Sequence, residues 1–216
     1  MTFAIIPAAG HSTRMGRPKL SLPLGERTVL EHVIAALREG GVDHVLVVVA
    51  PHVSELVPLA TRAGAEACLL SDPTADMRTT VESGLRWLEE GYRAEPDDYW
   101  LLAPGDHPAF GAEVVRKLLA AAGRDGRSIV VPVHSGRRGH PTMIAWKHVA
   151  GIRALPANDG INAYLRMHSA ETLELAVNEP GVLLDLDTPE DYQEMTASLT
   201  DSAPPFHARS APPPRA

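Results

Sequence analysis

One stretch near the N-terminus decides the fold of this chain: Ala8-Ala9-Gly10-His11-Ser12-Thr13-Arg14-Met15-Gly16-Arg17-Pro18-Lys19. It directly follows the apolar run Phe3-Ala4-Ile5-Ile6, which has the uninterrupted character of a strand buried on both faces. The stretch is therefore expected to leave the carboxyl end of a central parallel strand, which is where open α/β sheets place their ligands.

The composition of this loop suits a polyanion. Two glycines allow backbone turns that other residues resist, while two hydroxyls and three cations supply hydrogen-bond donors. These residues are Gly10 and Gly16, Ser12 and Thr13, and Arg14, Arg17 and Lys19. Two better-known glycine loops do not fit, because Arg17-Pro18 replaces the Lys-Ser/Thr of a P-loop and the G-x-G-x-x-G fingerprint is absent. The loop therefore predicts a phosphate site with solvated cations.

Composition places the chain among enzyme-sized proteins with one core. It has 216 residues, 44% of them hydrophobic, and its 20 Lys+Arg against 27 Asp+Glu give a net charge of -7. That charge argues against nucleic-acid or anionic-membrane partners. Cys68 is the single cysteine, which excludes internal disulfides and cysteine-rich zinc sites. With no signal-peptide pattern and no run of ~20 apolar residues, a cytoplasmic protein is expected.

The alternation of strand and helix patterns predicts a three-layer α/β/α Rossmann-like fold with a mostly parallel sheet. Thr28 and Glu31 form a capping box that opens the first helix. Further strands are expected at 44–50, 65–70, 99–103, 128–133, 142–146, 172–177 and 182–186, and helices at 55–63, 78–90, 112–122, around 164 and from 188. One domain covers residues 1–200, and the proline-rich residues 201–216 are expected to form a disordered tail.

Two acidic segments could hold magnesium. Asp106, in Gly105-Asp106-His107-Pro108, ends a buried strand and is expected to point into the crevice above the sheet. Asp185 and Asp187 follow another apolar stretch, and strand alternation would point both the same way. We expect Asp106 and Asp185 to share one Mg²⁺ ion, with Asp187 bracing the turn before the final helix.

Two other segments carry weaker signals. Gly139-His140-Pro141 by itself is a turn with a surface histidine. The segment from Asp76 to Gly84, which contains Thr80, has free amides and hydroxyls that suit an anion or a base edge, but an ordinary capped helix explains it equally well. Several further histidines lack metalloprotease spacing and are interpreted as surface or packing residues: His32, His44, His52, His148 and His168.

The loop pattern Ala-Ala-Gly-x-Ser-x-Arg-Met-Gly-x-x-Lys resembles the signature of the nucleotidyltransferases that act on the molybdenum cofactor, the branch that includes the cytidylyltransferases. The resemblance covers residues 3 to 195, with the segments around Asp106, His140 and Asp185 similar to the family's metal, acceptor-side and second metal motifs. It implies that Arg14, Lys19 and Asp106 are catalytic and that Asp106 and Asp185 bind Mg²⁺. The nucleotide and acceptor contacts that it implies are Ala8, Ala9, Gly10, Ser12, Thr80, Gly105 and His140.

The resemblance implies transfer of CMP from CTP to the phosphate of molybdopterin, with release of pyrophosphate and a molybdenum hydroxylase apoenzyme as a further partner. Ala9 favours CTP because guanosine-using relatives have a second glycine there. Two departures concern substrates: Asp76-Met77-Arg78-Thr79-Thr80 replaces Gly-Met-Ser-Ser-Ser, and Asn162 stands where many relatives have arginine. Two alternatives stay open, a non-catalytic factor that delivers the cofactor and a transferase with another phosphorylated acceptor, such as a sugar or isoprenoid phosphate.

Overall fold

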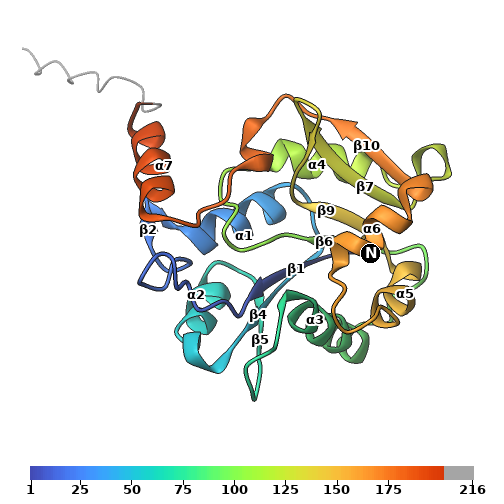
Figure 1. The fold of residues 1–216 in the computed structure, drawn as a ribbon, viewed down its shortest axis with the longest axis horizontal. Coiled ribbons are helices and arrows are strands. Elements are labelled where there is room, and N and C mark those ends of the chain that lie inside the picture. Colours follow the sequence, from blue (N-terminus) through green and yellow to red (C-terminus); the bar gives the residue numbers. More distant parts are fainter. Residues whose placement is uncertain (202–216) are drawn as a thin grey trace, which may run out of the picture.

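A computed structural model describes residues 1–201 of the chain (Figure 1). The part of the predicted tail that follows Asp201 lies outside the described residues. Within the described part, no helix combines the length and the apolar character needed to cross a bilayer.

The centre of the molecule is an eight-stranded sheet in the order β10-β7-β9-β6-β1-β4-β5, with β8 paired to β7. Strand β1 lies in the middle and runs parallel to both of its neighbours, β4 and β6. Strand β9 is antiparallel to β6 and to β7, so the sheet is mixed but mostly parallel, as predicted. The bounds are β1 Thr2–Ala8, β4 His44–Val49, β5 Glu66–Leu69, β6 Tyr99–Leu102, β7 Ile129–His134, β8 Arg137–Arg138, β9 Thr142–Ala145 and β10 Thr172–Ala176.

Helices cover both faces of this sheet because the side chains of β1 alternate between two cores. Ala4, Ile6 and Ala8 pack with helices α1, α2 and α4 on one face, whereas Phe3 and Ile5 pack with α3, α5 and α6 on the other. The three-layer prediction is therefore confirmed. The bounds are α1 Val29–Glu39, α2 Leu56–Arg62, α3 Met77–Gly91, α4 Ala112–Ala120, α5 Val149–Arg153, α6 Ile161–Met167 and α7 Pro189–Asp201.

The predicted strand at 182–186 is wrong. Residues 180–183 form a 3-10 turn, η5 (Pro180–Leu183), and residues 184–187 are irregular. The backbone amides of this segment bond outside any sheet ladder: Leu184 N–H donates to the carbonyl of Gly181, and Leu186 N–H donates to the carbonyl of Asp106. Strand alternation consequently does not determine where the side chains of this segment point.

The capping box at Thr28 is confirmed, and it predicts a measurable stability effect. Glu31 N–H donates to Thr28 Oγ at 3.3 Å, and Thr28 N–H donates to the Glu31 carboxylate at 2.7 Å.

We expect Thr28→Ala to lower the free energy of unfolding by about 1 kcal/mol and the melting temperature by roughly 2–4 °C. In the control, Thr61→Ala, the lost hydroxyl only donates to the carbonyl of Val57 inside helix α2. Equal shifts in both variants would show that the cap contributes nothing specific.

Candidate active site

The predicted loop leaves the carboxyl end of β1 and folds back as a tight turn. The amides of Met15 and Gly16 both donate to the carbonyl of Ser12 at 3.1 Å. Gly16 has φ +65°, a backbone conformation that favours glycine. Lys19 N–H then donates to Ser12 Oγ at 3.2 Å, which closes the turn on itself.

One buried side chain anchors this turn. Met15 is buried in a small apolar cluster with Leu22, Leu24, Val29 and Leu186. Because Leu186 belongs to the segment before α7, the loop and the C-terminal acidic segment share one core. The sequence therefore places Arg14 and Asp187 next to each other through the packing of their neighbours.

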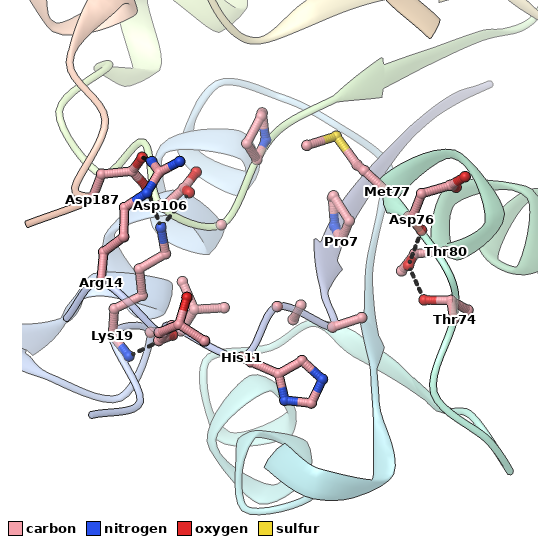
Figure 2. Close-up of a pocket in the computed structure, with 18 of the residues that line it drawn as sticks. Pro7, His11, Arg14, Lys19, Thr74, Asp76, Met77, Thr80, Asp106 and Asp187 are labelled. Carbon is pink, nitrogen blue, oxygen red and sulfur yellow. Dashed lines mark hydrogen bonds and ion pairs between the residues drawn. The ribbon is translucent and has the colours of Figure 1, made fainter. Parts of the chain in front are cut away.

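A cavity of about 410 Å³ opens above the carboxyl ends of β1 and β6. Its volume suits a small-molecule ligand. Figure 2 shows Arg14, Lys19, Asp106 and Asp187 gathered on one side, whereas residues around the start of α3 lie on the other. The lining residues of this cavity that the sequence predicted are Ala8, Ala9, Gly10, Ser12, Arg14, Lys19, Thr80, Gly105 and Asp106.

Lys19 is the central group of the charged side. Its Nζ donates to Asp106 Oδ2 at 2.7 Å and to Asp187 Oδ1 at 2.8 Å. Arg14 pairs with the other oxygen of Asp187. His107 Nδ1 lies 2.9 Å from the remaining oxygen of Asp106. Two cations and two carboxylates thus form one hydrogen-bonded cluster at the mouth of the loop.

The charges in this cluster stabilise one another. Burial by itself would raise the pKa of Asp106, but hydrogen bonds from His107 and Lys19 outweigh it and hold that pKa well below its usual range. Burial would likewise lower the pKa of Lys19, but Asp106 and Asp187 outweigh it and raise that pKa. Both groups therefore stay ionised at neutral pH.

Comparison with known proteins identifies the family. Residues 4–173 match the family model described as the MobA-like NTP transferase domain, which is more than half of the chain. The chain belongs to the MobA-like NTP transferase family. The resemblance noted in the loop is thereby confirmed, and the family match places the chain among enzymes.

Three proteins are informative as relatives of this chain. The molybdenum cofactor cytidylyltransferase of Escherichia coli K12 is 25% identical over 189 residues, which cover 87% of this chain and 92% of that protein. The 2-C-methyl-D-erythritol 4-phosphate cytidylyltransferase of Nitrosospira multiformis is 31% identical over 150 residues, 66% of this chain and 65% of that protein, so the chain spans less than two thirds of it. The crystal structure of a Mycobacterium sp. strain JC1 homologue of Mycobacterium tuberculosis Rv0371c superposes with a TM-score of 0.75 at 27% identity, covering 93% of this chain and 97% of that one.

The structure of this MobA-like chain does not bring Asp185 to the cavity of Asp106, as the predicted shared Mg²⁺ ion requires. Asp185 is exposed and lines a separate groove, which also contains Pro108 and Glu194. Asp187 shares the cavity with Asp106, and a single ammonium nitrogen contacts both carboxylates. The predicted brace before α7 is instead Asp191, whose carboxylate accepts from the amides of Asp187 and Thr188.

The Lys19 side chain is also less exposed to solvent than predicted. The loop cations were expected to be solvated, and the Arg14 side chain is indeed 73% exposed. The Lys19 side chain is only 15% exposed, because the carboxylates fold it against the loop. A short-range pattern cannot reveal this difference, because the two acids that enclose Lys19 lie 87 and 168 residues away.

His140 lies behind the cavity and does not line it. Its ring packs edge-on against His107, with centroids 4.9 Å apart, and its buried Nδ1 has no hydrogen-bond partner among the described residues. Burial and the nearby His107 lower the pKa of His140 to about 4, so the ring is neutral at neutral pH. A Cβ on the preceding Gly139 would meet the carbonyl oxygen of Val182 at 2.4 Å, which explains the glycine there.

Thr80 lies at the wall of the cavity, but its hydroxyl is already engaged. It bonds to Thr74 Oγ1 and donates to the carbonyl of Asp76 at 3.0 Å, which ties the preceding segment to α3. Asp76 caps α3 by accepting from the amide of Thr79. The capped-helix interpretation of this segment is therefore confirmed. Thr74 and His107 were not predicted as site residues, although His107 lies in the acidic segment Gly105-Asp106-His107-Pro108 that the sequence singled out.

Proposed function

We propose that this protein transfers CMP from CTP to the phosphate of a molybdopterin-type acceptor and releases pyrophosphate. The observation that carries the proposal is the cluster of Arg14 and Lys19 with Asp106 and Asp187 at the edge of a ligand-sized cavity. CTP is supported because both curated relatives reported above are named as cytidylyltransferases. Molybdopterin is favoured as the acceptor because the alignment with the molybdenum cofactor relative covers 92% of that protein, whereas the alignment with the methylerythritol relative covers only 65% of that protein.

The donor set fits a magnesium ion. Two carboxylates, Asp106 and Asp187, converge on one cation, Lys19 Nζ, with oxygen contacts of 2.7 and 2.8 Å. Mg²⁺ prefers oxygen ligands and is commonly held by one or two carboxylates with substrate phosphates and water. When bound here, the ion would neutralise charge on the triphosphate.

The residues of the chain would act by positioning and charge. An oxygen of the acceptor phosphate attacks the α-phosphorus of CTP in line, a new P–O bond forms, and the bond to the β-phosphate oxygen breaks to release pyrophosphate. We propose that Lys19 turns from the carboxylates to the triphosphate and that exposed Arg14 stabilises the charge on the leaving pyrophosphate. We also propose that amides near Ala9 and Gly10 contact the phosphates, because both residues line the cavity.

Pyrophosphate release tests the proposal. Purified protein is incubated with Mg²⁺, with CTP or GTP, and with molybdopterin or 2-C-methyl-D-erythritol 4-phosphate as the acceptor. We expect pyrophosphate only with CTP and molybdopterin together. If CTP gives pyrophosphate with the methylerythritol phosphate and not with molybdopterin, the methylerythritol phosphate is the acceptor. Saturable molybdopterin binding without pyrophosphate under any condition would favour the non-catalytic carrier.

A further inference from the structure

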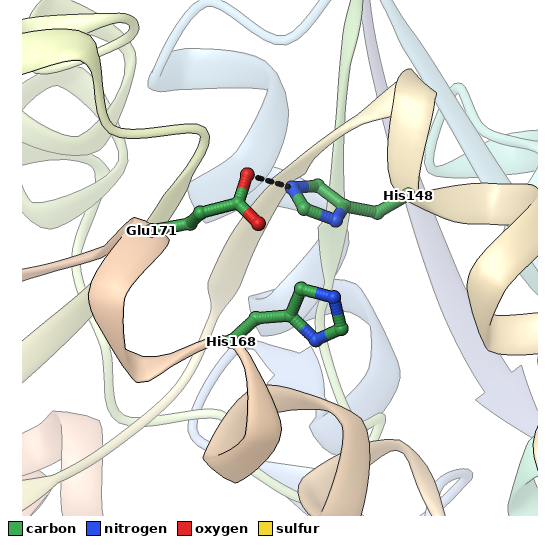
Figure 3. A group of neighbouring side chains, drawn as sticks. All are labelled: His148, His168 and Glu171. Carbon is green, nitrogen blue, oxygen red and sulfur yellow. Dashed lines mark ion pairs between the residues drawn. The ribbon is translucent and has the colours of Figure 1, made fainter.

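A second cluster of ligand-type side chains lies at the opposite edge of the sheet. Strands β7 and β10 run in the same direction as β1, so they begin at the edge where β1 also begins, away from the cavity. The turn η4 (Ser169–Glu171) leads directly into β10, and η3 (Trp146–His148) follows β9. His148, His168 and Glu171 meet at this edge (Figure 3).

The geometry of this cluster is that of a metal site. One ligand-type atom from each of the three residues lies within 4.8 Å of the others, and His148 Nε2 is 3.7 Å from Glu171 Oε2. His168 Nδ1 lies 2.9 Å from the backbone carbonyl of Tyr164, which can only accept, so this nitrogen carries the proton. His168 Nε2 therefore presents a lone pair, and among residues 1–201 it has no hydrogen-bond partner.

We propose that His148, His168 and Glu171 bind one divalent transition-metal ion of the Zn²⁺ class. Two imidazoles and one carboxylate are ligands that Zn²⁺ prefers, whereas Mg²⁺ selects oxygen. His168 and Glu171 are partly exposed, which leaves the fourth position to water. A histidine that binds a metal through one ring nitrogen usually donates a hydrogen bond from the other nitrogen to a carbonyl or carboxylate, which fixes the ring. The backbone carbonyl of Tyr164 does this for His168.

The surrounding polar groups hold these side chains in place. His148 Nε2 lies 2.8 Å from Ser128 Oγ and its Nδ1 lies 2.9 Å from the Tyr164 hydroxyl, so a metal ion would replace the Ser128 contact while Tyr164 orients the ring. Glu171 Oε2 accepts hydrogen bonds from Ser128 Oγ at 3.0 Å and from Lys147 Nζ at 3.2 Å, so the carboxylate already faces a cation. The Lys147 ammonium, 3.2 Å from the carboxylate, is half exposed and free to turn to solvent when a cation replaces it.

The predicted role is structural. The ion would join η3, the end of α6 and η4, and so fix the segment between β9 and β10 to the sheet edge. It would lie at the edge of the sheet remote from the cavity. Zn²⁺ should therefore raise thermal stability independently of nucleotide.

Zinc titration of the full chain by calorimetry tests this site. Excess Mg²⁺ is present throughout to occupy the oxygen-rich cluster at Asp106. We expect one Zn²⁺ ion per chain and a rise in melting temperature. His168→Ala and Glu171→Gln should each weaken Zn²⁺ binding by about 100-fold or more. Replacing a residue that only hydrogen-bonds to a metal ligand already lowers metal affinity by roughly 10- to 100-fold, and these variants remove a ligand itself. Co²⁺ bound in place of Zn²⁺ should give the intense visible absorption of a tetrahedral N/O site, and both variants should lose it.

Two histidine variants serve as controls. His134→Ala removes a half-buried ring with the same kind of contact, Nδ1 to a backbone carbonyl, here that of Val177. His52→Ala tests a second pair of histidines that could attract added zinc. The rings of His52 and His11 stack with their centroids 3.9 Å apart, and this variant removes one of them. Both controls should bind Zn²⁺ like the unchanged protein. Unchanged affinity in His168→Ala and Glu171→Gln, or an equal loss in His52→Ala, would overturn the proposal.

Discussion

Replacing Lys19 with alanine is expected to reduce nucleotidyl transfer by about 10²- to 10³-fold, the size of effect seen when one donor to a developing negative charge is removed. Within residues 1–201, Lys19 is the one side chain that hydrogen-bonds to both Asp106 and Asp187, and the loop presents it at the cavity. The measurement is the initial rate of pyrophosphate release at saturating CTP. Lys19→Arg should recover only part of the rate, because a planar guanidinium does not reproduce the two contacts of an ammonium.

Arg17→Ala provides the matched control for this prediction. Arg17 is a cation of the same loop, but it lies over the ring of Tyr192, 5.3 Å from the centroid, and does not line the cavity. Its removal lowers the charge of the loop equally and should leave the rate within about twofold, as expected for a surface change. If both variants lose activity alike, the loop acts through its net charge and Lys19 has no specific role.

Lys19→Ala should also lower stability, unlike the removal of an exposed cation. The variant leaves the Asp106 and Asp187 carboxylates facing each other without the ammonium between them. A cost of about 1–2 kcal/mol is expected, less than for a fully buried pair because both carboxylates keep contact with solvent. Thermal unfolding with and without Mg²⁺ measures it, and added Mg²⁺ should restore part of the loss.

The parts of the fold that local patterns determine were predictable. The apolar run before Ala8 predicted a buried central strand, and Thr28 with Glu31 predicted the start of α1, because each depends on residues within one turn or one strand. Lys19 and Asp106 were also predicted to share a site, because both follow the carboxyl ends of strands that turned out to be adjacent and parallel. Adjacent parallel strands end at the same edge of a sheet.

The errors arose where long-range packing determines the local structure. The segment at 182–186 is apolar enough for a strand, yet η5 forms there and Leu186 packs beneath the loop with Met15. This packing turns Asp187, and not Asp185, into the cavity. The cluster of His148, His168 and Glu171 was likewise missed, because His168 and Glu171 share one turn whereas His148 ends another, and only the folded sheet edge brings the two turns together.

Asp187→Asn is expected to raise the Mg²⁺ concentration needed for half-maximal activity by more than about tenfold, because one of two charged oxygen ligands becomes a neutral amide. Asp185→Asn, the matched control two residues away, should behave like the unchanged protein, since Asp185 faces another groove. Asp106→Asn should lose activity at every Mg²⁺ concentration, because the same substitution also removes a charged partner of Lys19 and His107.

The alternative role for Asp187 is to orient Arg14 and Lys19, with which it forms ion pairs. The two roles differ in their response to metal. If Asp187 only orients the cations, Asp187→Asn lowers the maximal rate while the Mg²⁺ dependence stays unchanged. If Asp187 binds the metal, higher Mg²⁺ recovers part of the rate, and Mn²⁺, a metal that carboxylate ligands also suit, should recover more. The two variants differ only in which cavity loses its carboxylate. If the Mg²⁺ dependence shifts in Asp185→Asn and stays unchanged in Asp187→Asn, Asp185 is the metal ligand and Asp187 is not.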